Sequence, residues 1–174
     1  DVTVVFCDDQ EQVDKIVEIR DRVPKVRKVI YEDPRGMRDY RVDDWFMAIK
    51  ELYALGEAAL DGDPDRFDAL IDAGKSDDVC HLCLTSGTTG LPKGAMISHE
   101  NLIAGCDQTM QVDPRQPTDE YMSFLPPAWI TENILGLTVH LRTGMVVNFP
   151  ESPETVQPNI REVAPQSLLF SARL

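Results

Sequence analysis

The feature that most constrains this chain is a glycine- and hydroxyl-rich segment at residues 84–94, which reads LTSGTTGLPKG and has apolar runs on both sides. Gly87 and Gly90 permit a close backbone approach that a side chain would block, so several peptide N–H groups can converge on anionic oxygens. The Ser and Thr hydroxyls add donors that can rotate, and Lys93 adds a positive charge. The segment therefore predicts a polyphosphate site, with ATP as the expected ligand.

The spacing of this segment excludes two common phosphate loops. A Walker-type loop needs Gly, four residues and then Gly-Lys-Ser/Thr, whereas here Pro92 precedes Lys93 and Gly94 follows it. The chain also contains no Gly-x-Gly-x-x-Gly stretch, which excludes the dinucleotide-binding fingerprint. The structural alternative is a Thr/Gly-rich surface turn that binds no ligand.

Short apolar runs alternate with amphipathic segments along the chain, which predicts an α/β fold with a mainly parallel sheet flanked by helices on both sides. The expected strands are 2–7, 26–31, 79–84, 95–97, 121–125, 145–149 and 167–170. The expected helices start at Asp9 and Ser98, cover 43–60, 130–141 and 153–163, and include a short one around 67–71. Residues 2–7 are almost all apolar, so we expect this strand to be buried on both faces.

The strands on both sides of the loop also bear on how it would attract phosphate. A connection from strand to strand places no helix N-terminus at the anion, so the loop amides, the hydroxyls and Lys93 would have to supply the attraction.

Composition narrows the classes of partner. The net charge of −13 argues against nucleic acid, because proteins that bind phosphate backbones usually carry a basic face. No apolar stretch approaches the length of a membrane span and no signal peptide is present, so we expect a soluble cytoplasmic protein; peripheral membrane association and oligomeric state stay open. Cys80 and Cys83 lack a second pair at metal-ligand spacing, and we expect them to be buried strand thiols.

Residues 84–94 and the following AMISHENL closely resemble the phosphate-binding signature of the adenylate-forming, or AMP-binding, enzymes. These include acyl-CoA synthetases, luciferases and the adenylation domains of peptide synthetases. Residues 5–15 and 144–165 resemble the central part of the N-terminal domain of a long-chain fatty acyl-CoA synthetase. The resemblance covers almost the whole chain. It implies that residues 1–174 are part of an AMP-binding domain, without the C-terminal domain that carries the family's catalytic lysine.

The resemblance also implies a reaction. A fatty acid carboxylate attacks the α-phosphate of ATP, pyrophosphate leaves, and the thiol of CoA displaces AMP from the acyl-adenylate, with Mg²⁺ as the expected metal. By this match, Lys93 and Thr85 are the expected catalytic residues, and Thr85 is also an expected Mg²⁺ ligand. The expected nucleotide-binding residues are Thr85, Ser86, Gly87, Thr88, Thr89, Gly90 and Lys93.

A second segment, residues 123–132, resembles the next family motif, in which a strand ends in Leu-Pro and an aromatic residue lies beside the acyl pocket. Trp129 stands where long-chain synthetases usually have His. A Trp has more apolar area and no titrating nitrogen, so we expect a wall of the substrate pocket and no acid–base role. The structural alternative is a core tryptophan after a turn.

Other parts of the family's machinery have no counterpart. Thr131-Glu132 lacks the aromatic-Gly that precedes the family's magnesium-binding Glu, and Thr143-Gly144 is followed by Met145 instead of the ribose-binding Asp. We therefore expect this chain alone to be inactive. A fatty carboxylate is already ionised near neutral pH, so the histidines are not needed as bases. Two alternatives remain: another adenylate-forming ligase, such as an aryl-CoA ligase or a peptide-synthetase domain, and a noncatalytic nucleotide-binding module.

Overall fold

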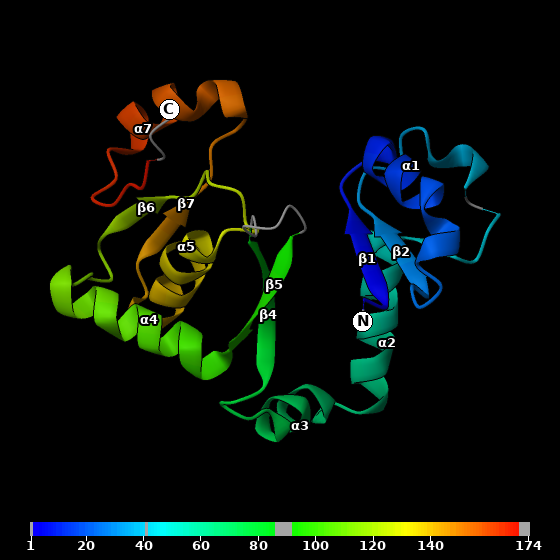
Figure 1. Cartoon of the computed structure of the whole chain (residues 1–174), viewed down its shortest axis with the longest axis horizontal. Helices are drawn as coiled ribbons and strands as arrows, with labels where there is room; N and C mark the ends of the chain where they lie inside the picture. Colours follow the sequence, from blue (N-terminus) through cyan, green and yellow to red (C-terminus); the bar gives the residue numbers. More distant parts are fainter. Residues whose placement is uncertain (1, 41, 86–91, 171–174) are drawn as a thin grey trace. The chain divides into compact units, whose positions relative to one another are not determined.

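The computed structural model describes residues 2–40, 42–85 and 92–170. The chain divides into two compact units, Asp1–Ala73 (unit 1) and Gly74–Leu174 (unit 2). Each unit combines parallel strands with helices, which confirms the predicted α/β class (Figure 1). Among the described residues, no helix is both long enough and apolar enough to cross a membrane.

Unit 1 is built on a parallel three-stranded sheet. Its strands are β1 (Val4–Cys7), β2 (Lys28–Tyr31) and β3 (Phe46–Ala48), in the order β1-β2-β3. Helix α1 (Gln10–Glu18) connects β1 to β2 together with the 3₁₀ turn η1 (Arg20–Arg22), and a second 3₁₀ turn, η2 (Met37–Asp39), precedes β3. The Asp9 carboxylate caps α1 by accepting from the Gln12 N–H at 3.1 Å, as the sequence predicts.

Helix α1 covers one face of this sheet. Val13 of α1 packs with Val29, Met37 and Trp45 in the core of the unit, and the Trp45 indole N–H donates to the Val26 carbonyl at 2.9 Å. The prediction that residues 2–7 are buried on both faces is wrong, since Phe6 is 64% exposed. The physical reason is that α1 packs only on the face to which Val29 belongs.

The helix predicted at 43–60 begins later than expected. Phe46–Ala48 pairs with β2 as strand β3, and helix α2 runs over Ile49–Gly62. The chain turns from strand to helix at Ala48, whose N–H donates to the Glu51 carboxylate at 2.9 Å. Helix α3 (Arg66–Ala73) confirms the predicted short helix, and neither α2 nor α3 has a buried residue.

Unit 2 starts with an antiparallel hairpin. Strands β4 (Val79–Thr85) and β5 (Lys93–Ser98) pair with each other, and helix α4 (His99–Val112) follows directly. Cys83 is buried as predicted, but Cys80 is exposed. The register of the hairpin shifts between Val79 and His81, so Cys80 is the extra residue of this irregularity and has no position in the regular ladder.

The rest of unit 2 packs around a second parallel pair, β6 (Glu120–Met122) and β7 (Val146–Asn148). The predicted helix at 130–141 is present as α5 (Ile130–Glu132), a π-helical segment η3 (Asn133–Val139) and α6 (His140–Thr143). Gly144 ends it with φ 78°, as expected of a helix terminator. After β7 come the 3₁₀ turn η4 (Pro153–Thr155) and helix α7 (Val156–Val163). The strand predicted at 167–170 is reduced to one bridge between Ser167 and Tyr121 within the described part of the chain.

Candidate functional site

The structure pairs the two ends of the predicted phosphate loop. Thr85 is the last residue of β4 and Lys93 the first of β5, and they are direct partners in the ladder. The Thr85 hydroxyl donates to the Lys93 carbonyl at 3.3 Å. The predicted strand-to-strand connection is therefore confirmed. The remaining predicted loop residues, Ser86, Gly87, Thr88, Thr89 and Gly90, lie outside the described residues.

The exposed ends of this hairpin are polar and cationic. Thr85 and Lys93 are both exposed, and no carboxylate in the described ranges pairs with the Lys93 ammonium group. An ammonium group without an internal partner is available to an anion from solution. The described part of the site can thus offer one hydroxyl and one positive charge to a phosphate group.

The opposite end of the hairpin is anchored to α4. Ser98 caps this helix: its hydroxyl accepts from the Asn101 N–H at 3.2 Å, and the Asn101 side-chain oxygen accepts from the Ser98 N–H at 3.1 Å. The His99 N–H also donates to the Asp78 carbonyl at 3.2 Å. These bonds hold the last residue of β5 and the start of β4 together, so the strand pair leads from a fixed base to the loop.

Trp129, the predicted pocket residue, is next to a cavity of about 480 Å³ in the same unit. The cavity is lined by Phe124, Leu125, Pro126, Trp129, Pro150, Glu151, Ser152, Pro153 and Val156. Trp129 is 46% exposed, which excludes the alternative that it is a core tryptophan. The lining is largely apolar, which is typical of cavities that bind small molecules.

The turn before Trp129 lies beside the base of the phosphate loop. The Cys83 thiol donates to the Ala128 carbonyl at 3.5 Å, and Cys83 is two residues from Thr85 on β4. Asn133 stabilises the same turn, because its side-chain amide donates to the carbonyls of Pro127 at 2.8 Å and of Trp129 at 3.1 Å. Two segments that lie far apart in the sequence thus meet in one region of unit 2.

The sequence analysis considered Glu132 only as a magnesium-binding residue and did not predict its burial, yet Glu132 is 6% exposed. Its carboxylate accepts from the Tyr121 hydroxyl at 2.8 Å and from the Ser123 hydroxyl. Burial, and then the hydrogen bond to this carboxylate, raise the pKa of the Tyr121 phenol. A signal was available in the pattern: Tyr121 and Ser123 alternate along an extended segment, and Glu132 and Gly136 are four residues apart on a helix.

The three histidines lie at different positions in unit 2. His99 is exposed at the first residue of α4, and the His140 Nδ1–H donates to the Met145 carbonyl at 2.5 Å. His81 is on β4, and within the described residues its buried Nε2 has no hydrogen-bond partner.

The oxygen atoms that the described site residues offer suit magnesium only when the ion is already bound to phosphate. Over residues 2–40, 42–85 and 92–170, no group of three or more His, Cys, Asp or Glu side chains could hold a metal ion. Mg²⁺ prefers carboxylate, phosphate and water oxygens, and Thr85 offers a single hydroxyl. The described residues therefore fit Mg²⁺ that arrives on the phosphates of ATP and do not form a protein cage for the ion.

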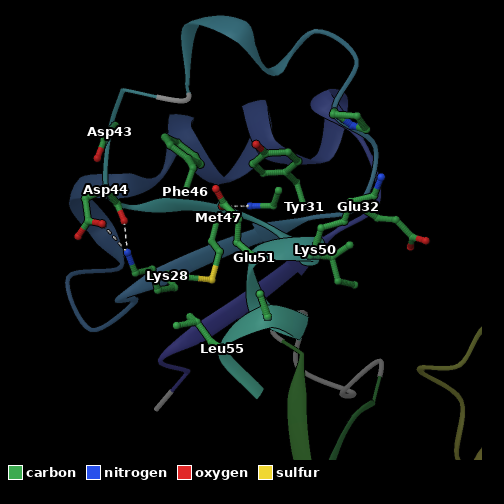
Figure 2. A pocket seen from close by; sticks show the side chains of 14 residues that line it. Lys28, Tyr31, Glu32, Asp43, Asp44, Phe46, Met47, Lys50, Glu51 and Leu55 are labelled. Atoms are coloured by element: carbon green, nitrogen blue, oxygen red, sulfur yellow. Dashed lines mark hydrogen bonds and ion pairs between the residues drawn. The ribbon is translucent and has the colours of Figure 1, made fainter. Parts of the chain in front are cut away.

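A larger groove of about 860 Å³ lies in unit 1, along β2, β3 and the start of α2 (Figure 2). None of the predicted site residues lines it. Its charges are partly paired internally, since the Lys28 ammonium donates to the Asp44 carboxylate at 2.9 Å and to the Asp44 carbonyl. The cavity of larger volume is therefore not the one beside the predicted site residues.

Comparison with known proteins places the chain in a family. A model described as AMP-binding enzyme matches residues 1–169. The long-chain-fatty-acid–CoA ligase ACSBG2 of Xenopus laevis is 27% identical over 185 residues, which cover 100% of this chain and 24% of the relative. The long-chain-fatty-acid–CoA ligase ACSBG1 of Rattus norvegicus is 31% identical over 172 residues, which cover 94% of this chain and 23% of the relative. The chain thus spans about a quarter of the length of these relatives.

Solved structures show the same fold. A Rhodopseudomonas palustris protein assigned as a long-chain-fatty-acid CoA ligase superposes with a TM-score of 0.69 at 17% identity, over 98% of this chain and 38% of that one. The ATP-bound MatB of the same organism gives a TM-score of 0.58 at 21% identity, over 95% of this chain and 29% of that one. Because the family model matches nearly its full length, the chain belongs to the AMP-binding enzyme family.

Proposed function

We propose that this chain is the phosphate-binding part of an ATP-dependent acid–thiol ligase that activates a long-chain fatty acid. The observation that carries the proposal is the pairing of Thr85 with Lys93 at the base of the phosphate loop, beside the apolar turn of Trp129. The identity of about 30% to long-chain-fatty-acid–CoA ligases supports the substrate class.

The proposed reaction has two steps. In the first step, a carboxylate oxygen of the fatty acid attacks the α-phosphorus of ATP, and the bond to the β-phosphate oxygen breaks to release pyrophosphate. Lys93 offsets the charge that builds on the leaving pyrophosphate. The Thr85 hydroxyl, which donates to the Lys93 carbonyl in this structure, would rotate to donate to the pyrophosphate oxygens instead. Mg²⁺ bound to ATP would share this neutralisation. In the second step, the CoA thiolate attacks the acyl carbonyl carbon and AMP leaves.

No residue of this chain is needed as a base in the first step, because the fatty acid is ionised near neutral pH. The contribution of the chain is then positioning and charge: the hairpin holds the phosphates, and the cavity beside Trp129 holds the acyl group. All four cysteines are free thiols, which supports a reducing compartment such as the cytoplasm.

The test is acid-dependent pyrophosphate release by the intact ligase, with Lys93→Ala compared with wild type. We expect the variant to lower kcat for adenylation by about 100- to 1,000-fold with little change in KM for the fatty acid, as when a transition-state donor is removed. Lys75→Ala is the matched control, since Lys75 is also an exposed lysine of unit 2.

The outcomes separate the alternatives. A loss confined to fatty acid affinity would contradict the role of Lys93. Faster adenylation of aryl or amino acids than of fatty acids would identify another adenylate-forming ligase, and ATP binding without pyrophosphate release from any acid would identify a noncatalytic module.

We also propose that residues 1–174 form part of a larger AMP-binding domain and are inactive alone. The chain's span of about a quarter of its relatives supports this. Production of acyl-CoA from ATP, fatty acid and CoA by the purified 174-residue chain would contradict it.

A further inference from the structure

Glu132 is a buried carboxylate held by hydroxyl groups alone. Tyr121 and Ser123 donate to its two oxygens, and both are themselves buried. In the described part of the chain, no Lys, Arg or His forms an ion pair with Glu132. A buried carboxyl group is costly to desolvate unless its oxygens are hydrogen-bonded, so the bonds from Tyr121 and Ser123 fix where this side chain can lie.

The surrounding backbone makes room for this carboxylate. A Cβ atom at Gly136 would lie 2.5 Å from Glu132 Oε1 and 3.4 Å from Tyr121 Cε1. Gly136 is in the π-helical segment η3, immediately after α5. Any side chain at position 136 would push the carboxylate away from its two donors.

Glu132 does not line the cavity beside Trp129, but it links the segment that carries Phe124 and Leu125 to the turn that carries Trp129. On one side, it binds Ser123, which directly precedes the lining residues Phe124 and Leu125. On the other side, its own N–H donates to the Trp129 carbonyl at 3.1 Å. A shorter or differently shaped side chain at position 132 would therefore alter the distance between Trp129 and Phe124–Leu125.

We propose that Glu132 is a positioning residue that sets the width of the substrate pocket between Trp129 and Phe124–Leu125, and so selects which acids are activated. The inference rests on the proposed function. It goes beyond that function by assigning selectivity to a residue that does not contact the acid.

The test is a comparison of Glu132→Ala with wild type in the intact ligase, over fatty acids of increasing chain length. We expect KM for the best acid to rise about tenfold or more, since small misplacements of positioning groups have effects of this size or larger. KM for ATP should stay within about twofold, and the preferred chain length should shift. Glu100→Ala, at an exposed glutamate of α4 in the same unit, is the matched control and should change neither constant.

A double-mutant cycle shows whether Glu132 acts through Trp129. If it does, Glu132→Ala with Trp129→Ala should have about the same kcat/KM for the acid as Trp129→Ala alone. Glu132→Gln keeps the size of the side chain and can still bond both hydroxyls, so it should restore the wild-type chain-length preference. If Glu132→Ala does not fold, Ser123→Ala replaces it, because it removes one of the two donors.

Three results would overturn the proposal: additive effects in the cycle, an equal rise in KM for ATP, or an unchanged chain-length preference. Each of these would leave the proposed function standing, because the wild-type enzyme would still form acyl-adenylate. Absence of adenylate with every acid in the wild-type enzyme would reject the proposed function and this inference together.

Discussion

Strands β2 and β4 are both apolar in sequence, yet the structure uses them differently. Val29, Ile30 and Tyr31 of β2 are all buried, whereas Cys83 is the only buried residue of β4 and Leu84 is 71% exposed. The first strand is central in a parallel sheet under a helix, and the second belongs to a two-stranded hairpin. An apolar run therefore predicts a strand well, but burial depends on what packs against it.

The two units also differ in the predicted site residues that they contain. The predicted site residues that the structure describes, Thr85, Lys93 and Trp129, all belong to unit 2. Unit 1 contributes a packed core around Met37 and Trp45. Substitutions in the core of unit 1 should therefore change stability, and substitutions at the hairpin ends should change chemistry.

The largest stability effect is expected in the core of unit 1. Met37 is fully buried, so Met37→Ala removes packed atoms and leaves a cavity, at a cost of about 3 kcal/mol. Amide hydrogen exchange would show faster opening across β1 and β2, while Lys93→Ala should leave exchange in both units unchanged. Equal losses of protection from both variants would remove the distinction between the two regions.

The helix caps provide a matched pair across the units. Asp9 caps α1 and Ser98 caps α4, each through a side-chain oxygen that accepts a backbone N–H. Asp9→Ala and Ser98→Ala should each lower local stability by about 1 kcal/mol, visible as faster exchange in the first turn of the affected helix. In the intact ligase, Ser98→Ala should also slow adenylation, because Ser98 ends the strand that begins at Lys93, and Asp9→Ala should not. A slowing by both variants or by neither would contradict this.

The smallest effect is expected at the exposed ion pair of unit 1. The hydrogen bond from Arg20, and then the one from the Trp45 N–H, lower the pKa of the Asp43 carboxyl below 3.8. A carboxyl whose pKa is lowered by folding stabilises the fold above its unfolded pKa, and this contribution disappears as the pH falls through the folded value. Asp43→Asn should therefore reduce the loss of stability below about pH 4, whereas Asn at the exposed Asp65 should not.

Tryptophan emission can follow this titration, because the Arg20 guanidinium lies 4.3 Å from the Trp45 ring. With Trp129→Phe, Trp45 is the remaining tryptophan of the 174-residue chain. An acid transition that is identical with and without Asp43 would show that the pair has no role in stability.

Much of the fold follows from local patterns. The strand on each side of the phosphate loop and the helix starts at Asp9 and Ser98 depend on neighbouring residues, and the structure confirms them. The strand Phe46–Ala48 could not be distinguished from the helix that follows it. No Gly or Pro separates the two elements, and the apolar residues of the strand fit the helical period.

The candidate site is predictable only in part. The loop's own residues predict a phosphate site, the family resemblance adds the roles expected of Thr85 and Lys93, and the structure places these two residues opposite each other. Glu132 could not be assigned in this way, because its partners Tyr121 and Ser123 come from another element and a carboxylate is usually solvated. The burial of Cys80 was mispredicted because the irregular register of the hairpin leaves no trace in composition.

The absence of a side chain at Gly136 has a consequence for which substitutions related proteins can carry. A methyl group there would lie 2.5 Å from Glu132 Oε1, so the carboxylate would have to leave its place beside Tyr121 and Ser123 unless residue 132 were smaller. Positions 132 and 136 should therefore be inherited as a pair. Relatives that replace the glutamate should also be those in which an alanine or larger residue at 136 is tolerated.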